Sequence, residues 1–235
     1  MALKTNNYHM KKILFALSFL MAFTALEAQD IQLHYDMGKD RKYLTSTVEM
    51  FKPGPYGSTY FFIDMDYGAN NVQGVALAYW EIARGLKFWD NPFEIHVEYN
   101  GGFGQYAPGG AYQINDAWLF GGNYTWNTAD YSRIFTLQLM YKTIRGKNKN
   151  SFQVTGVWTL QFFNNKVTLD GFADFWREDF TLNGHKTKFV FLSEPQFWYN
   201  VTKNFSVGSE IELSTNFSQH YGFMVNPTIA GKWTF

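Results

Sequence analysis

Hydrophobic and polar residues alternate along most of the chain after residue 28. In the last segment the apolar positions fall on every second residue: Phe223, Val225, Pro227, Ile229, Gly231, Trp233 and Phe235. Because successive side chains of a β-strand point to opposite faces, this pattern predicts a strand with one apolar and one polar side. Pro227 lacks a backbone N–H, so we expect a kink, a bulge or an unpaired position there.

The same alternation recurs upstream between segments rich in Gly, Pro and Asn, which predict turns. It predicts an all-β domain over residues 29–235, with no helix and no repeat of fixed period. The run from Val75 to Ile82 is apolar on both faces, so its facing stays open. Twelve strands are predicted, over residues 30–37, 43–52, 58–67, 72–82, 92–104, 112–125, 131–143, 151–162, 166–178, 187–199, 204–214 and 219–235.

The first 28 residues have the pattern of a secretory signal peptide. Lys11 and Lys12 precede an apolar run over residues 13–26, which ends near the small residue Ala28. Fourteen residues of helix span about 21 Å, which is too short for a hydrocarbon core of about 30 Å. We therefore predict export, with cleavage near Ala28 and with Met10 as an alternative start.

Two architectures share this alternation, namely a soluble β-sandwich or lipocalin-like binder and an outer-membrane barrel. Three observations favour a transmembrane antiparallel β-barrel of about 12 strands in the outer membrane of a Gram-negative bacterium. The strands are long enough to cross a bilayer at a tilt, and the chain ends on Phe235 within an alternating strand, which resembles the signal read by the barrel assembly machinery. Aromatic residues also lie near the predicted strand ends, as in interfacial girdles: Tyr43, Phe51, Tyr67, Phe93, Phe103, Tyr124, Tyr131, Tyr141, Phe152, Phe162, Phe197, Tyr199, Phe205 and Trp233.

Composition narrows the function further. The chain has no Cys, so it cannot form a cysteine-ligated zinc site, an iron–sulfur cluster or a disulfide. Its 20 basic and 20 acidic residues provide no basic excess for nucleic acid. Aromatic residues make up 20% of the chain and charged residues 17%. We predict no cofactor, no metal and no nucleic-acid partner, and expect the lipid bilayer and a small solute as partners.

If the polar faces point inward, the predicted lumen is acidic and partly aromatic. Its basic candidates are Arg133 or its neighbours by register, Lys142, Lys188 and Lys232, and His34 also faces this way. Acidic pores attract cations and aromatic faces stack on ring-bearing solutes, whereas the alternative role for each residue is a structural salt-bridge network. The predicted solute-binding residues are Glu49, Phe62, Asp64, Asp66, Glu94, His96, Glu98, Asp170, Phe172, Asp174, Trp176, Glu194, Trp198, Glu210 and Glu212.

Several short segments carry a family resemblance: Thr47–Phe51, Tyr60–Asp66, Asn91–Glu98, Trp118–Tyr124 and Gly171–Trp176. The order of these segments and their pattern of residues resemble those of the Tsx-type nucleoside-specific channels of Gram-negative outer membranes. The resemblance implies a twelve-stranded barrel with a narrow, acid- and aromatic-lined lumen that passes nucleosides. The positions that it implies are Glu49, Asp64, Glu94, Glu98, Asp174 and the aromatic Phe172. This chain has shorter loops and lacks the family's Trp-rich opening.

An outer-membrane barrel enzyme acting on lipids is the second functional hypothesis. Ser218 and His220 lie on one face of a predicted strand, but no flanking sequence resembles a lipase motif. We therefore expect that the chain is not an enzyme.

Overall fold

The computed structural model describes residues 29–39, 41–147 and 150–235. The predicted signal peptide lies outside the described residues. The elements are β1 (Gln29–Asp36), β2 (Leu44–Gly54), β3 (Gly57–Tyr67), η1 (Ala69–Asn71), β4 (Val75–Leu86), β5 (Phe93–Tyr106), β6 (Gly110–Asn127), β7 (Arg133–Ile144), β8 (Ser151–Phe162), β9 (Val167–Leu182), β10 (His185–Ser193), β11 (Gln196–Asn200), β12 (Phe205–Thr215) and β13 (Phe223–Thr234). No helix in this described part is long and apolar enough to cross a bilayer.

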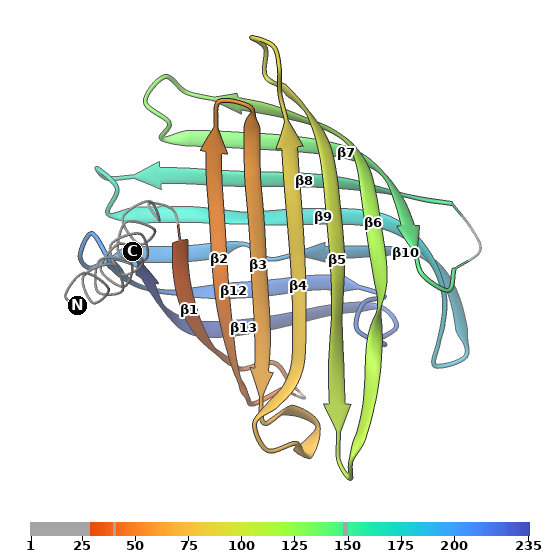
Figure 1. Cartoon of the computed structure of the whole chain (residues 1–235). Coiled ribbons are helices and arrows are strands. Elements are labelled where there is room, and N and C mark those ends of the chain that lie inside the picture. Colours follow the sequence, from red (N-terminus) through yellow and green to blue (C-terminus); the bar gives the residue numbers. More distant parts are fainter. Residues whose placement is uncertain (1–28, 40, 148–149) are drawn as a thin grey trace, which may run out of the picture.

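The strands form one closed antiparallel barrel with twelve positions. Apart from β10 and β11, neighbouring strands in the sequence pair with each other, and β1 pairs with β13 to close the wall. β10 and β11 both lie between β9 and β12, so they share one position. Figure 1 shows β2 to β5 as the near wall and β8, β9, β12 and β13 crossing behind them, as tilted strands of a barrel do.

The predicted strand over residues 187–199 is therefore broken. The break falls at Glu194 and Pro195, which interrupts the ladder because Pro has no N–H to donate. The chain stays in register because Glu194 N–H donates to the Phe172 carbonyl at 3.1 Å. The glycine at position 171 permits this close approach, because a Cβ there would lie 2.4 Å from the Glu194 carbonyl oxygen.

Other boundaries differ by a few residues. β4 begins at Val75 rather than at residue 72, because the 3₁₀ turn η1 and a bend precede it, and it extends to Leu86. β6 and β9 are longer than predicted and β13 is shorter. Asn183 and Gly184 both have positive φ, of 49° and 82°, and this lets a two-residue turn join β9 to β10.

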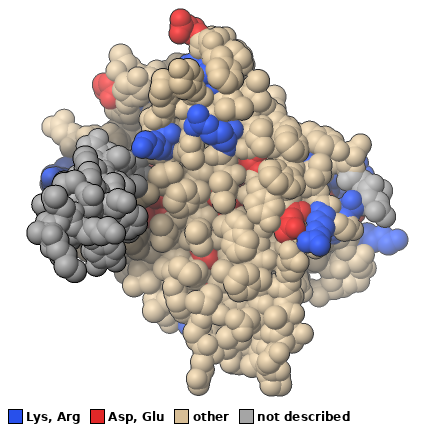
Figure 2. Space-filling model, in the orientation of Figure 1, with Lys and Arg blue, Asp and Glu red and all other residues tan. Residues whose placement is uncertain are grey.

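The apolar face of the alternation lies on the outside of the barrel. Residues such as Ile31, Leu139 and Ile229 are 44%, 58% and 61% exposed, whereas their polar neighbours Gln32 and Asn226 are 1% exposed. In Figure 2 most of the near face is uncharged, with a few basic side chains across its upper part, one red and blue group to the right, and small red patches between. This arrangement suits a lipid-facing wall and excludes the soluble sandwich, whose apolar faces would be inside.

The β12–β13 ladder is interrupted beside Pro227, at residues 228–229, while Pro227 itself stays in register with Ile211. Backbone pairing skips from Gly208–Ala230 to Ile211–Pro227. Side chains fill the gap, because Glu210 N–H donates to Thr228 Oγ1 at 3.0 Å and Ser209 Oγ donates to the Thr228 carbonyl at 2.7 Å.

Candidate functional site: the barrel lumen

The lumen-facing side chains of β2, β3 and β4 form a wall of acids and rings. In one row across the sheet Glu49 pairs with Phe62, and Phe62 pairs with Glu81. The Phe62 ring lies 6.1 Å from that of Tyr60 and 5.9 Å from that of Tyr79. We call the following set the acidic-aromatic wall, and all its members are partly exposed: Glu49, Tyr60, Phe62, Asp64, Tyr79 and Glu81.

Hydrogen bonds orient the carboxylates of this wall. Thr47 Oγ1 donates to Asp64 at 2.5 Å, and Gln32 donates to Glu49 at 3.3 Å. Glu81 accepts from the Tyr79 hydroxyl at 2.7 Å and from Asn100 Nδ2 at 3.0 Å. The carboxylates are therefore held in place on a sheet rather than carried on mobile loops.

Further carboxylates face this wall from the other side of the barrel. Glu194 and Glu210 both interact electrostatically with Asp64, and Asp170 interacts with Glu49. All three are partly exposed. Negative charge from two walls thus meets in one lumen, where low-dielectric walls focus the field and favour cations over anions.

Two lysines sit inside the barrel, each over an aromatic ring. Lys232 Nζ lies 4.2 Å from the Trp198 ring centroid and 3.5 Å from Asp170. Lys142 Nζ lies 4.5 Å from the Trp176 ring centroid and donates to Gln153 at 2.7 Å. They offset only part of the acidic charge.

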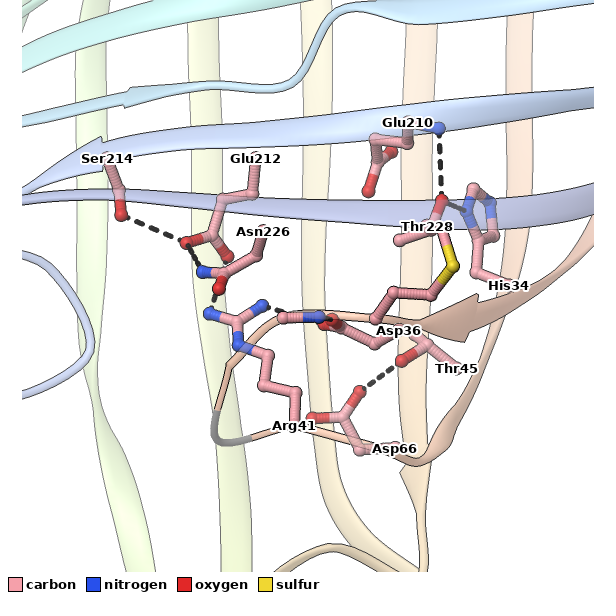
Figure 3. Close-up of polar contacts among 12 residues, drawn as sticks. His34, Asp36, Arg41, Thr45, Asp66, Glu210, Glu212, Ser214, Asn226 and Thr228 are labelled. Carbon is pink, nitrogen blue, oxygen red and sulfur yellow. Dashed lines mark hydrogen bonds and ion pairs between the residues drawn. The ribbon is translucent and has the colours of Figure 1, made fainter.

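Arg41 lies in the β1–β2 loop at the mouth of the lumen, at the end of the barrel opposite Gln29 and Phe235, and it bridges β1 to β12 past the intervening β13. Its guanidinium contacts Asp36 at 3.0 Å and Glu212 on β12 at 2.8 Å. Figure 3 shows the side chain extended between these two carboxylates, with Asn226 beside Glu212. Asn226 Nδ2 donates to Glu212 at 3.1 Å. We call this set the Arg41 strut.

The part of the lumen lined by β6, β7, β9 and β10 is packed with apolar side chains instead. Leu119 is 0% exposed and Val190 is 1% exposed. Phe217, from the loop between β12 and β13, packs against this group. Its ring contacts the Trp176 ring edge-on, with 6.1 Å between the ring centroids. The following residues make up what we call the packed half: Ala117, Leu119, Met140, Ile144, Trp176, Val190, Phe180, Leu192 and Phe217.

The structure separates the predicted solute-binding residues into two groups. Nine of them line the lumen and are partly exposed: Glu49, Phe62, Asp64, Asp66, Glu94, Asp170, Phe172, Glu194 and Glu210. The remaining six point inward but are buried by their neighbours: His96, Glu98, Asp174, Trp176, Trp198 and Glu212.

The buried members have local partners that explain their burial. His96 Nε2 contacts Glu98 at 2.9 Å, and the other ring nitrogen contacts Asn123 at 3.0 Å. Trp198 is 0% exposed because it lies over Gly208, where a Cβ would be 2.6 Å from the ring. These side chains are packed within the wall, and their contact with a solute stays a prediction. His34 is held likewise, by Thr228 at 3.1 Å and Gln32 at 2.9 Å.

Three expectations about side-chain placement are wrong. Lys188 is exposed, because the β9–β10 register shifts between Thr187 and Phe189. Arg133 is exposed at the end of β7. Tyr43 lies in the β1–β2 loop and interacts electrostatically with Asp66 and Arg41, so it belongs to the lumen mouth and not to the aromatic girdle.

The sequence patterns missed several lumen residues. Tyr79 and Glu81 lie in the segment whose facing the pattern left open, and only their pairing with Phe62 and Asp64 could have placed them. Asp30 precedes the apolar alternation and accepts from Gln32 at 3.0 Å. Arg41 carried no signal, because its placement depends on how the loop folds back.

The structure does not bring Ser218 and His220 together as a catalytic pair. Both lie in the loop between β12 and β13, and no hydrogen bond links their side chains among the described residues. Ser218 has a φ of 48°, a left-handed turn conformation, so the predicted strand does not reach it.

Solved outer-membrane porins have a similar fold. The NanC porin superposes with a TM-score of 0.56 at 12% identity, covering 88% of this chain and all of that one. The KdgM porin superposes with a TM-score of 0.52 at 11% identity. The KdgM porin in complex with disordered oligogalacturonate superposes with a TM-score of 0.50, also at 11% identity. Both alignments cover 88% of this chain and 99% of the porin chain. The twelve-stranded barrel is therefore confirmed, and this fold indicates the outer membrane of a Gram-negative bacterium.

A family model described as "Domain of unknown function (DUF5020)" matches residues 28–235. No curated protein matches the chain.

Proposed function

We propose that this chain, which belongs to the DUF5020 family, is an outer-membrane channel for small polar solutes that carry a ring. The observation that carries the proposal is the row Glu49–Phe62–Glu81, in which an aromatic face lies between two carboxylates on a partly exposed lumen wall. A ring stacks on an aromatic face with about 1–3 kcal/mol per base in nucleic-acid complexes. Carboxylates accept hydrogen bonds from hydroxyl and N–H groups at the ring's edge.

Nucleosides are the solutes that we name for the test. They combine a flat heterocycle with sugar hydroxyls, and the wall offers both a stacking surface and acceptors for these groups. The resemblance to Tsx-type channels adds support, since four of the six positions that it implies are partly exposed to the lumen: Glu49, Asp64, Glu94 and Phe172.

The charge of the lumen argues against a polyanionic solute. One porin of similar fold is described with oligogalacturonate, which is a chain of carboxylate-bearing sugars. In this chain Glu49, Asp64 and Glu210 face the lumen, and like charges in a low-dielectric pore repel one another. We therefore propose a different solute class for this barrel despite the shared fold.

Planar-bilayer conductance and liposome swelling test the channel. Folded mature protein should give ion current and should admit adenosine or uridine faster than galacturonate oligomers. Phe62→Leu should slow nucleoside entry, whereas the lipid-facing control Phe152→Leu should not. Heat-modifiable protein with neither current nor swelling would contradict the channel itself.

We propose that the barrel transports solutes and catalyses no reaction. To test this, phospholipid turnover is measured for the reconstituted barrel and for its Ser218→Ala variant. Turnover that disappears in the variant would contradict a purely transporting role.

We also propose that the barrel assembly machinery reads Phe235. Its side chain is 58% exposed beyond β13, while its N–H donates to the Gln29 carbonyl at 3.1 Å. Phe235→Ala should therefore lower the amount of assembled barrel in outer membranes but leave refolding in detergent unchanged. Equal assembly of both proteins would reject this role.

A further inference from the structure

We propose that the acidic-aromatic wall binds organic ammonium groups, so that amine-bearing ring compounds are the preferred solutes of this barrel. This inference rests on the proposed channel function for its biological meaning. The binding itself is a property of the wall, and it can be measured whether or not the channel conducts.

The barrel already binds ammonium groups of its own in this way. Lys232 Nζ sits over Trp198 and beside Asp170, at 4.2 and 3.5 Å. In the same manner Lys147 Nζ sits 4.2 Å from the Phe180 ring and 3.2 Å from Glu178. An ammonium ion over a ring face is attracted by the negative face of the ring, and a neighbouring carboxylate adds attraction.

Lys142 repeats the arrangement. Its Nζ lies 4.5 Å from the Trp176 ring centroid and interacts electrostatically with Asp174. Lys232 inside the barrel and Lys147 in the β7–β8 turn each have a ring below and a paired carboxylate beside, and Lys142 inside the barrel has the ring with a carboxylate at longer range. The combination of ring and carboxylate is therefore a repeated feature of this chain and does not depend on one contact.

The acidic-aromatic wall has the same two components without a lysine of its own. Phe62 stands between Glu49 and Glu81 in one cross-strand row, and its ring adjoins those of Tyr60 and Tyr79. None of the ion pairs among the described residues involves a carboxylate of this wall. Lys142 and Lys232 act on Glu81 and Glu49 only at longer range.

A second observation, independent of the acidic charge, points to a hydrogen-bond donor here. Asn100 is 4% exposed and donates Nδ2 to Glu81, yet its Oδ1 has no partner among the described residues. Buried acceptors without partners are uncommon and call for an explanation. Asn100 also faces Glu81 directly across the β4–β5 ladder, so the amide that carries the buried free acceptor contacts a carboxylate of the wall.

The opposite side of the lumen favours the same ligand. Glu194 and Glu210 act on Asp64 across the lumen. A ligand that presents one ammonium group to this space relieves repulsion among several carboxylates at once, whereas a neutral ring relieves none.

Three isosteric probes test the inference: phenethylammonium, 2-phenylethanol and phenylacetate. Their binding to the refolded mature chain in neutral detergent is followed by titration calorimetry, with the intrinsic aromatic fluorescence as a second readout. We expect phenethylammonium to bind at least about tenfold more tightly than 2-phenylethanol, which corresponds to one charge-assisted contact. Phenylacetate should not bind.

Two variants locate the site, and each has a matched control. Phe62→Leu should weaken phenethylammonium binding by about 3- to 10-fold, and the lipid-facing control Phe152→Leu should not change it. Glu81→Gln should weaken it by about tenfold, while Asp116→Asn, which removes a carboxylate paired with Arg145 outside the wall, should have no effect.

The outcomes separate the inference from the proposed function. Equal binding of phenethylammonium and 2-phenylethanol, or undiminished binding by both wall variants, would overturn the inference even if the barrel conducts. Selective binding that both wall variants weaken would sustain it even in a barrel that gives no current, and only the channel proposal would then fail.

Discussion

Two regions of the same lumen differ sharply, although the same alternation of side chains builds both. In the packed half, inward residues such as Leu119 and Val190 are almost completely buried against one another. In the acidic-aromatic wall, the inward residues Phe62 and Asp64 stay partly exposed. Period-two alternation therefore determines which side chains point inward, but it does not determine whether they fill the interior or line a path. That depends on what faces them across the barrel.

The difference also separates two energetic roles. Close-packed interiors lose stability when atoms are removed, because the surroundings relax only in part. A wall of facing carboxylates gains little from its own charges, since they repel one another. We infer that the packed half stabilises the barrel and that the acidic-aromatic wall gives it selectivity.

The largest expected effect comes from a cavity in the packed half. Trp176→Ala should destabilise the barrel by about 3–5 kcal/mol, as large-to-small changes in packed cores do, and also removes the ring under Lys142. Phe62→Ala removes a ring of the wall and should cost much less, because that ring is partly exposed. Urea unfolding in lipid vesicles measures both. Equal losses in the free energy of unfolding would show that the two regions do not differ in their contribution to stability.

A smaller effect is expected at the Arg41 strut. Arg41→Gln leaves Asp36 and Glu212 without their shared cation, and hydrogen bonds to charged groups contribute about 1.5–3 kcal/mol each. The mouth should widen, so single-channel conductance should rise while stability falls. Arg145→Gln, at an exposed ion pair, serves as the control. Unchanged conductance in Arg41→Gln would show that the strut does not limit the path.

Neutralising the facing carboxylates should alter selectivity with little effect on stability. The double variant Asp64→Asn with Glu210→Gln should shift the reversal potential in a salt gradient toward zero, because it removes the focused negative potential. The urea midpoint should stay the same or rise slightly as repulsion is relieved. If the unmodified barrel already has a reversal potential that indicates anion preference, the acidic-aromatic wall does not make the barrel cation-selective.

The smallest effect is expected outside both regions. Asp116 pairs with Arg145 at 3.1 Å, and the arginine side chain is 65% exposed. Asp116→Asn should change the free energy of unfolding by less than about 1 kcal/mol, as exposed ion pairs usually do. A larger loss would mean that the part of β6 around Asp116 contributes to the packed half.

The sequence predicted the outer surface well and the interior only in part. Every outward position that contacts lipid favours an apolar side chain. The outward direction of Ile95, Leu139 and Val225 could therefore be predicted from their spacing alone. Inward positions follow no single rule. Leu119 and Val190 lie inside with the polar residues, because neighbouring strands supply an apolar partner for each.

The missed residues have a common cause, namely that their positions depend on tertiary contacts. Glu81 lies in a run whose two faces look alike, and only its pairing with Phe62 settles its direction. Arg41 and Tyr43 acquire their positions from a loop that folds over the mouth. Trp198 was predicted to contact solute, but its burial depends on Gly208 in the neighbouring strand.

The seam between β1 and β13 has a consequence for how the barrel forms. It pairs Asp30 with Thr234 and Asp36 with Thr228, so it joins segments about as distant in sequence as the described chain allows. Closing such a long loop costs conformational entropy before the contacts of the seam can compensate for it. Chains dominated by pairings between distant segments therefore fold slowly. Until the last strand docks, both edges of the sheet expose unpaired backbone groups, which hydrocarbon does not tolerate. Closure is thus the step at which an incomplete barrel is most vulnerable to aggregation and proteolysis, and the His34–Thr228 contact lies on that seam.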